Sequence, residues 1–209
     1  MGLFSKKPNF EDQYAWDTRS TYDSFWKTTW EFIVEIVKVV VISLAIIIPI
    51  RYFLIQPFYV KGASMEPNFE DHQYLIVNEI SYRFQEPTRG DIIVFRYPKD
   101  PRQYFIKRII GLPGETVKVK DGKIYIFNEQ YAQGIAVNEN DYLENAFTSG
   151  NKELTLGEEE YFVLGDNRNA SLDSRSFGAV PKRLIKGKVW LRGWPFDDFK
   201  IFTTPNYQF

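Results

Sequence analysis

The stretch "ETVKVKDGKIYIF", residues 115–127, predicts two adjacent β-strands and the turn that joins them. Residues 115–120 and 123–127 are short runs rich in β-branched and aromatic side chains, which favour extended backbone. Asp121 and Gly122 lie between the runs, and this pair is a strong signal for a two-residue hairpin turn. We therefore expect an antiparallel β-hairpin here.

Runs of the same kind recur through residues 57–209, separated by breaks at Gly90, at "LPG" (112–114) and in the polar stretch 138–158. They are "QYLIVN" (73–78), "DIIVFRY" (91–97), "QYFIKRII" (103–110), "EYFVLG" (160–165) and "KVWLRG" (188–193). No long helical period occurs after residue 57. This pattern predicts a mainly β domain of coiled or barrel-like antiparallel sheet.

The N-terminal region differs in kind. Residues 1–31 are polar and aromatic with mixed charges and no clear period, so we interpret them as an N-terminal tail. Residues 32–56 contain a run from Val39 to Ile50 without any charge, and it reaches about 20 residues if the flanking Lys38 and Arg51 snorkel. We predict one transmembrane helix, with a buried or amphipathic helix as the alternative. A cleaved signal peptide would start earlier and end in small residues.

The distribution of basic residues predicts the orientation of this anchor. Five precede it, whereas only Arg51 and Lys61 follow closely; the five are Lys6, Lys7, Arg19, Lys27 and Lys38. By the positive-inside rule the N-terminus stays in the cytoplasm, and residues 57–209 lie outside it.

Composition excludes several classes of function. The net charge of −1 gives no electrostatic basis for binding nucleic acid. With no cysteine, neither a disulfide nor a thiolate metal site can form. His72 is the single histidine and carboxylates show no dense cluster, so we expect no metal and no other cofactor.

The segment "GASMEPNF", residues 62–69, contains a candidate nucleophile. Gly62, Ala63 and Pro67 leave a tight and little-shielded backbone around Ser64. Ser64 is either an ordinary turn residue or a serine exposed for attack. His72 follows in the polar loop "EDHQ", where we expect a solvated side chain and not a base.

Lys107 and Arg108 interrupt the apolar run "YFIKRII", residues 104–110. Alternation places at least one of the two cations on an apolar face. One explanation is an edge strand protected by inward charge. The other is a lysine whose pKa is lowered by burial, so that its neutral amine serves as a general base.

A further polar loop, "GDNRNASLDSRSFG", occupies residues 165–178. One interpretation is a long turn that satisfies its own backbone groups. In addition, Asp173 and Arg175 flank Ser174 and are placed to form an ion pair that stiffens the loop.

Taken in order, these segments resemble the type I signal peptidases, membrane-anchored serine proteases that remove signal peptides from exported proteins. The resemblance covers most of residues 32–195: the span, "GASMEP", "RGDIIVF" (89–95), "YFIKRIIGLPGE" (104–115) and the 165–178 loop. It implies that Ser64 is the nucleophile and Lys107 the general base. It also implies that Ser171 hydrogen-bonds the lysine, with Asp173 and Arg175 supporting that loop.

Three positions depart from the family pattern. We expect the Ser64 N–H to be the first oxyanion donor. Many members supply a second donor from a hydroxyl residue two positions before the nucleophile, whereas this chain has Gly62, so either a backbone N–H substitutes or the oxyanion hole is weaker. Asn68 stands where threonine is favoured, and Asn169 where aspartate is favoured. Neither Asn68 nor Asn169 touches the proposed Ser–Lys pair; these two departures concern fine positioning and not the chemistry.

The resemblance also implies a substrate and a location. We expect a monomer in the bacterial inner membrane, in contact with lipid, that cleaves exported precursors after small residues. The alternatives are a tethered β domain that only binds, a self-cleaving repressor-type protein, and a mitochondrial or plastid peptidase of the same family. A repressor would need a DNA-binding helix-turn-helix, and residues 1–56 supply an apolar segment instead.

Overall fold

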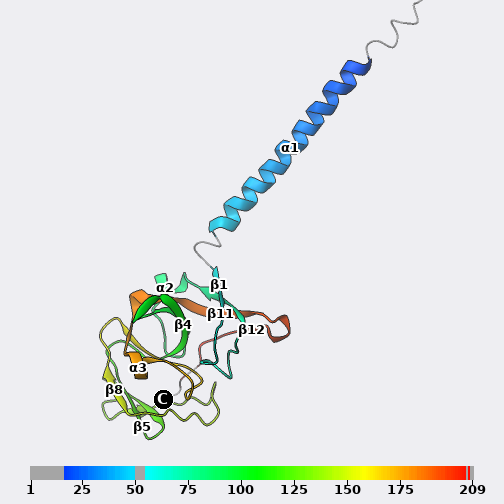
Figure 1. The fold of residues 1–209 in the computed structure, drawn as a ribbon. Helices are drawn as coiled ribbons and strands as arrows, with labels where there is room; N and C mark the ends of the chain where they lie inside the picture. Colours follow the sequence, from blue (N-terminus) through cyan, green and yellow to red (C-terminus); the bar gives the residue numbers. More distant parts are fainter. Residues whose placement is uncertain (1–16, 50–54, 206, 208–209) are drawn as a thin grey trace, which may run out of the picture. The chain divides into compact units, whose positions relative to one another are not determined.

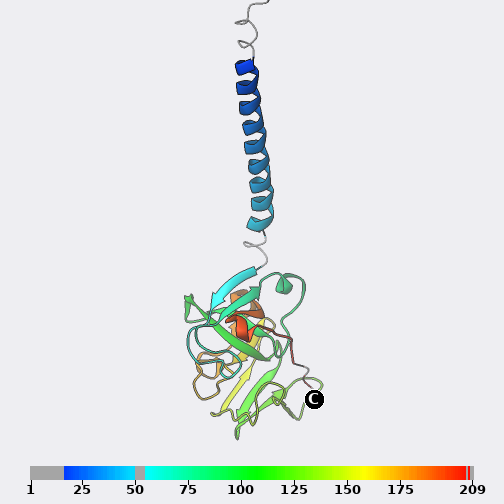
Figure 2. The ribbon, with the colours of Figure 1, turned by 90° about the vertical axis from the view of Figure 1, so that its right-hand side faces the viewer.

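A computed structural model describes residues 17–49, 55–205 and 207, and the chain divides after Ile50 into two compact units (Figures 1 and 2). In the first unit, α1 runs from Asp17 to Pro49. Its segment Phe25–Pro49 is long and apolar enough, by length and composition, to cross a membrane.

The helix α1 therefore begins within the region assigned above to the tail. Residues 17–31 are helical because neither glycine nor proline interrupts the chain before Pro49. Of the predicted anchor, residues 50–54 lie outside the described residues. The boundaries 1–31, 32–56 and 57–209 stay predictions.

The second unit is built mainly of short strands, which confirms the predicted fold class. The strands are β1 (Ile55–Tyr59), β2 (Tyr74–Asn78), β3 (Ile92–Tyr97), β4 (Asp100–Gly111), β5 (Thr116–Lys120), β6 (Lys123–Phe127), β7 (Ile135–Ala136), β8 (Lys152–Thr155), β9 (Glu160–Leu164), β10 (Val180–Pro181), β11 (Ile185–Trp194) and β12 (Lys200–Ile201). Four one-turn helices connect them: α2 (Ser81–Phe84), α3 (Ser174–Phe177), η3 (Lys182–Leu184) and η4 (Phe196–Asp198).

These strands form two antiparallel sheets. The larger has the order β1-β2-β11-β3-β4-β9-β10, with β12 paired to β11, and the smaller has the order β7-β6-β5-β8. Figure 1 shows β5 and β8 at the end of this unit opposite to β1. The predicted hairpin is confirmed, because β5 and β6 pair across Asp121 and Gly122, whose φ angles of 50° and 78° are both positive.

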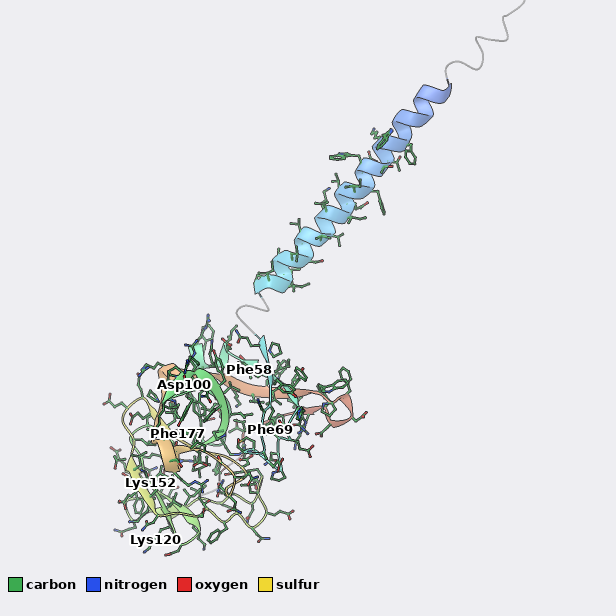
Figure 3. All side chains as sticks on the ribbon, in the orientation of Figure 1. Phe58, Phe69, Asp100, Lys120, Lys152 and Phe177 are labelled. Atoms are coloured by element: carbon green, nitrogen blue, oxygen red, sulfur yellow. The ribbon has the colours of Figure 1, made fainter. Side chains whose placement is uncertain are left out.

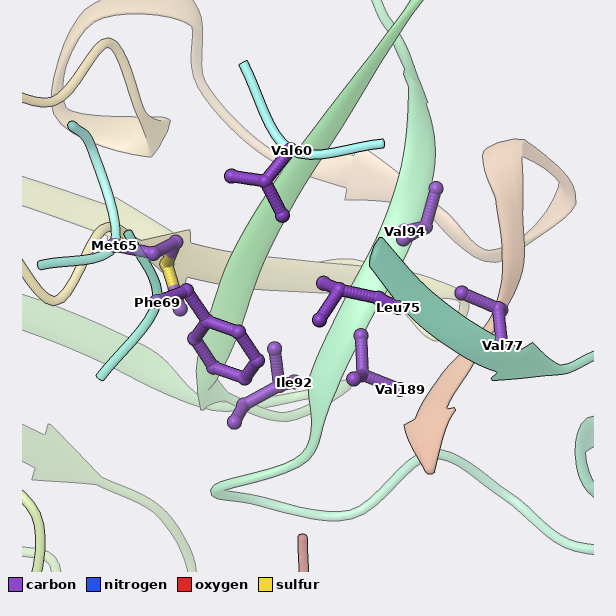
Figure 4. Close-up of a cluster of buried hydrophobic side chains, with 8 residues drawn as sticks. All are labelled: Val60, Met65, Phe69, Leu75, Val77, Ile92, Val94 and Val189. Atoms are coloured by element: carbon purple, nitrogen blue, oxygen red, sulfur yellow. The ribbon is translucent and has the colours of Figure 1, made fainter. Parts of the chain in front are cut away.

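Apolar side chains from both sheets fill the interior of this unit in three buried clusters. Figure 3 draws the side chains of the described residues on the ribbon. One buried cluster lies beneath the segment that carries Ser64 (Figure 4); it comprises Val60, Met65, Phe69, Leu75, Val77, Ile92, Val94 and Val189. Met65 and Phe69 are both fully buried there. Because Met65 directly follows Ser64, its burial fixes the serine at the surface of the core.

Candidate active site

The turn that holds Ser64 is stabilised by its own backbone. The Phe69 N–H donates to the carbonyl of Met65 at 2.9 Å, and the Glu66 N–H donates to that of Ala63. Gly62 precedes them with a φ of 94°, a conformation that residues other than glycine rarely adopt. This turn leaves the Ser64 hydroxyl directed at strand β4.

Ser64 and Lys107 lie 43 positions apart in the sequence, and the fold brings their side chains together. The Nζ of Lys107 lies 2.7 Å from the Oγ of Ser64, and 2.7 Å from the carbonyl oxygen of Ile106. Lys107 belongs to β4, where it pairs with Ile93 of β3, and its side chain is almost wholly buried. Its Nζ lies 5.5 Å from the centre of the Phe105 ring.

The surroundings of Lys107 alter its charge. Burial lowers the pKa of Lys107 from 10.5 to about 8, although the nearby negative charges of Asp173 and Asp166 oppose this change. The lowered pKa gives the lysine a neutral fraction of about one tenth at pH 7. A neutral amine in hydrogen-bond contact with a hydroxyl is able to act as its base.

The structure also bears on the two explanations of the "KR" pair. Strand β4 lies between β3 and β9, but its pairing with β9 begins only at Arg108, so residues up to Lys107 keep one open edge. Both cations are buried, and Arg108 is compensated by Asp166, with Nε–Oδ1 at 2.8 Å and Nη2–Oδ2 at 2.6 Å. Arg108 thus has a carboxylate partner, whereas Lys107 faces the serine.

Asp173 and Arg175 form the predicted ion pair. The Arg175 Nη2 lies 2.8 Å from the Asp173 Oδ2, and the Asp173 Oδ1 also accepts a hydrogen bond from the Arg175 backbone N–H, which caps α3. Asp173 is fully buried and further accepts from the Gly165 N–H at 3.2 Å. The loop therefore satisfies its own backbone and is stiffened by an ion pair, so both interpretations hold.

Ser171 does not make the predicted hydrogen bond to Lys107. Its Oγ is buried and has no hydrogen-bond partner among the described residues. The Lys107 Nζ instead contacts Ser64 and the Ile106 carbonyl. Ser171 packs closely on Gly165, where an added Cβ would lie 2.2 Å from the Ser171 Oγ and 2.4 Å from the Ser64 carbonyl oxygen.

Sequence reasoning missed the residues that hold the nucleophile turn against this loop. The Asn167 N–H donates to the Ser64 carbonyl at 3.1 Å, and its side-chain amide donates to the Ala63 carbonyl at 3.0 Å. The Asn68 side chain donates to Asp166 at 2.9 Å. Asp166 and Asn167 both belong to the "GDN" start of the 165–178 loop, so the motif carried a signal, but its contacts were not evident from spacing.

An open cleft of about 450 Å³ leads to Ser64 and Lys107. One side is the segment from Phe58 to Ala63, and another is Gln103 to Lys107 of β4, with Ala170 and Leu172 completing the lining. Among the described residues, β1 pairs with β2 alone, and the pairing of β4 with β9 begins at Arg108. The second edge of β1 and the 103–107 edge of β4 therefore leave backbone groups available to an extended peptide.

Gly62 contributes no side chain to this site. Its N–H donates to the Asp71 Oδ1 at 2.8 Å, and this hydrogen bond is the main reason that the pKa of Asp71 is lowered. The space where a Cβ would stand is open. The Gly62 N–H is thus already engaged, and the Ser64 N–H makes no hydrogen bond among the described residues.

His72 and Asn169 take no part in the site. His72 is an exposed loop residue, as expected, whose Nδ1 lies 3.0 Å from Asp71, and the described residues show no contact between it and Ser64. Asn169 is also exposed. Within the ranges that the structure describes, no three His, Cys, Asp or Glu side chains gather as a metal site requires.

Comparisons with known proteins identify the family of this chain. Residues 33–194 match the model of the family "Signal peptidase, peptidase S26". The probable signal peptidase I-2 of Synechocystis sp. is 35% identical over 85% of this chain and 79% of its own. Signal peptidase I of Leptolyngbya laminosa is 37% identical over 84% of this chain and 87% of its own.

A signal peptidase IB of Staphylococcus aureus is 30% identical over 80% of this chain and 92% of its own. The crystal structure of a signal peptidase I from Enterococcus faecalis, 36% identical, covers 50% of this chain and 97% of its own, with a TM-score of 0.41. The chain belongs to the signal peptidase S26 family and is a serine peptidase of that family.

Proposed function

We propose that this chain is a membrane-anchored serine endopeptidase that removes N-terminal signal peptides from exported precursors, cutting after small residues. Membership of the signal peptidase family supports signal peptide cleavage. The observation that carries the finer proposal is the 2.7 Å contact between the Ser64 Oγ and the Nζ of Lys107, whose pKa is lowered to about 8.

The reaction divides into two steps. Neutral Lys107 takes the proton of the Ser64 hydroxyl while Oγ attacks the carbonyl carbon at the cleavage site. The resulting lysine ammonium then returns that proton to the departing amine, which leaves an ester on Ser64. Water, deprotonated by the same lysine, hydrolyses the ester and restores both side chains.

The negative oxygen formed during attack needs hydrogen-bond donors. We assign the Ser64 N–H as the first donor, because the Gly62 N–H already donates to Asp71. The family's side-chain hydroxyl has no equivalent at Gly62. Asp173 and Arg175 act indirectly by holding the 165–178 loop, from which Asn167 positions the nucleophile turn.

The cleft fits a substrate that binds as an added strand. An extended peptide lying between the segment 58–63 and the 103–107 edge of β4 would pair with backbone groups on either side. Ala170 and Leu172 are among the residues that line the cleft. Cleavage after small residues is the specificity that membership of the signal peptidase family implies.

The apolar segment Phe25–Pro49 supports attachment to a membrane. An anchored enzyme shares the bilayer with the apolar core of its substrate, which raises the effective concentration of one for the other. We further propose that the protein is a monomer in the bacterial inner membrane, with a cytoplasmic N-terminus and residues 57–209 on the outer side. The excess of basic residues before the span supports this orientation.

The full chain in detergent, incubated with a secretory precursor, tests the proposal when the cleavage site is located by mass spectrometry. Ser64→Ala should abolish cleavage because it removes the nucleophile. Lys107→Arg should abolish it too, because guanidinium stays protonated at any usable pH. His72→Ala is the matched control and should retain activity.

Substantial cleavage by Lys107→Arg, or loss of cleavage in a folded His72→Ala protein, would overturn the Ser–Lys mechanism. Cleavage after large residues would overturn the proposed specificity.

A further inference from the structure

A second open cavity, about 680 Å³ in volume, shares no lining residue with the cleft at Ser64. We call it the basic groove, because five cationic side chains and two carboxylates are among its lining residues. The cations are Arg83, Arg96, Lys182, Arg183 and Lys186, and the carboxylates are Glu79 and Glu159. The whole chain has a net charge of −1, so this excess of positive charge is local.

The arginines of the basic groove are not neutralised within the protein. Lys182 lies 2.5 Å from Glu86, and Lys186 lies 3.6 Å from Glu79. Arg83, Arg96 and Arg183, in contrast, are exposed and have no carboxylate partner among the described residues. Arg96 lies 5.8 Å from the centre of the Tyr104 ring, whereas Arg83 and Arg183 have no such contact there. Two guanidinium groups therefore remain available to a ligand.

Residues of the basic groove lie next to the first strand that follows the anchor segment in the chain. Asn78 pairs with Ile55, the first residue of β1, and also with Lys188 of β11. The groove residues Glu79 and Lys186 are close neighbours of these paired positions in the chain. The groove thus lies beside the end of the sheet that follows the apolar helix after only residues 50–54.

An exposed aromatic side chain adjoins the basic groove. Phe84 of α2 directly follows Arg83 and is 83% exposed. A cation next to an exposed phenyl ring suits the boundary between lipid headgroups and acyl chains.

We propose that the basic groove binds the headgroup of an anionic phospholipid. This inference rests on the proposed membrane function. Guanidinium groups bind phosphate oxygens with two parallel hydrogen bonds, and Arg83 and Arg183 supply them. Lys182 and Lys186 keep their carboxylate partners Glu86 and Glu79. Each unpaired arginine near an anionic headgroup should strengthen binding about fivefold.

Titration of the full chain in non-ionic detergent micelles tests this, with dihexanoyl phosphatidylglycerol as the probe and calorimetry as the readout. The double variant Arg83→Gln/Arg183→Gln should bind the probe about 30-fold more weakly than the unmodified chain. The control Lys120→Gln/Lys152→Gln removes two charges from the smaller sheet (Figure 3) and should bind as the unmodified chain does. Equal thermal unfolding midpoints would show that both variants fold.

Equal weakening in the control variant, or unchanged binding in the groove variant, would overturn the proposal. Inorganic phosphate that displaces the probe at matching concentrations would assign the groove to free phosphate and overturn the lipid assignment. Dihexanoyl phosphatidylcholine should bind weakly, because its headgroup carries no net charge.

The same samples separate this inference from the proposed function. Both variants should cleave a short soluble peptide at the unmodified rate, since neither changes the Ser64 cleft. If no sample cleaves peptide while the lipid titration behaves as expected, the proposed function fails and the lipid site stands. If every sample cleaves the peptide but the groove variant binds lipid as the unmodified chain does, the proposed function stands and the lipid site fails.

Discussion

Asp173 is expected to influence the pH at which this peptidase becomes active. Burial lowers the pKa of Lys107 to about 8, and the negative charges of Asp173 and Asp166 keep that pKa from falling further. The substitution Asp173→Asn removes one of these charges but keeps a side-chain oxygen that is able to accept from the Arg175 N–H. The pKa of Lys107 should therefore fall below about 8 in this variant.

The magnitude follows from the neutral fraction of the lysine. With a pKa of about 8, Lys107 is neutral in about 1% of molecules at pH 6, about 10% at pH 7 and about half at pH 8. If neutral lysine is the base, kcat/KM should rise about tenfold from pH 6 to pH 7 and level off above about pH 9. In Asp173→Asn the same curve should shift toward acid.

Folding stability offers a second readout with a definite sign. Because the folded pKa of Lys107 is lowered, the unfolded chain binds more protons between about pH 8 and pH 10.5. The contribution of Lys107 to the free energy of unfolding should therefore rise across that window, by about 3 kcal/mol in total. Below pH 8 the buried ammonium is destabilising by the same amount.

The assay is kcat/KM on a small-residue peptide between pH 6 and pH 10 in detergent, for the unmodified chain and Asp173→Asn. Glu153→Gln is the control, since Glu153 is an exposed residue paired with Lys118 on the smaller sheet. A curve that is flat with pH in the unmodified chain would refute the reasoning. So would a curve that stays in place, or moves toward alkali, in folded Asp173→Asn.

Three further experiments test other parts of the proposed structure and function. Gly165→Ala should lower kcat/KM about 100-fold, because the new Cβ would lie 2.4 Å from the Ser64 carbonyl oxygen and would displace the serine. The control is Gly157→Ala, whose new Cβ would meet only the flexible Glu160 side chain. Equal activities of the two variants would contradict this reasoning. Ser174→Ala should lower the free energy of unfolding by about 1–3 kcal/mol, because the buried Val163 N–H loses its acceptor. Ser171→Ala should lower it much less, because the Ser171 hydroxyl has no partner among the described residues. Chemical unfolding that ranks the two variants in the opposite order would count against this. Protease added to intact spheroplasts should digest residues 57–209, and protection until lysis would disprove the proposed orientation.

The sequence alone was sufficient for the fold class, the candidate span and the family. Turn chemistry at Asp121-Gly122 and the short β-branched runs are local signals, and the hairpin formed where they predicted it. Motif order indicated Ser64 and Lys107 as the candidate pair without a structure, and their roles as nucleophile and base stay predictions. Helix α1 begins at Asp17, within the predicted tail; residues 17–31 show no apolar period that would indicate a helix, but they contain no glycine or proline to break one.

Tertiary structure decided everything that depends on which strands lie side by side. Spacing could not show that Lys107 would be buried against the turn that carries Ser64, and this burial is what lowers its pKa. It could not match Arg108 with Asp166, nor show that Asn167 holds the Ser64 turn, since these contacts join segments about 60 and 100 residues apart along the chain. The basic groove likewise exists only where α2, β3 and η3 converge in space. The residue type alone determines the charge and the hydrogen-bonding groups of a side chain, but its desolvation and its partners are determined only when the sheets enclose that side chain.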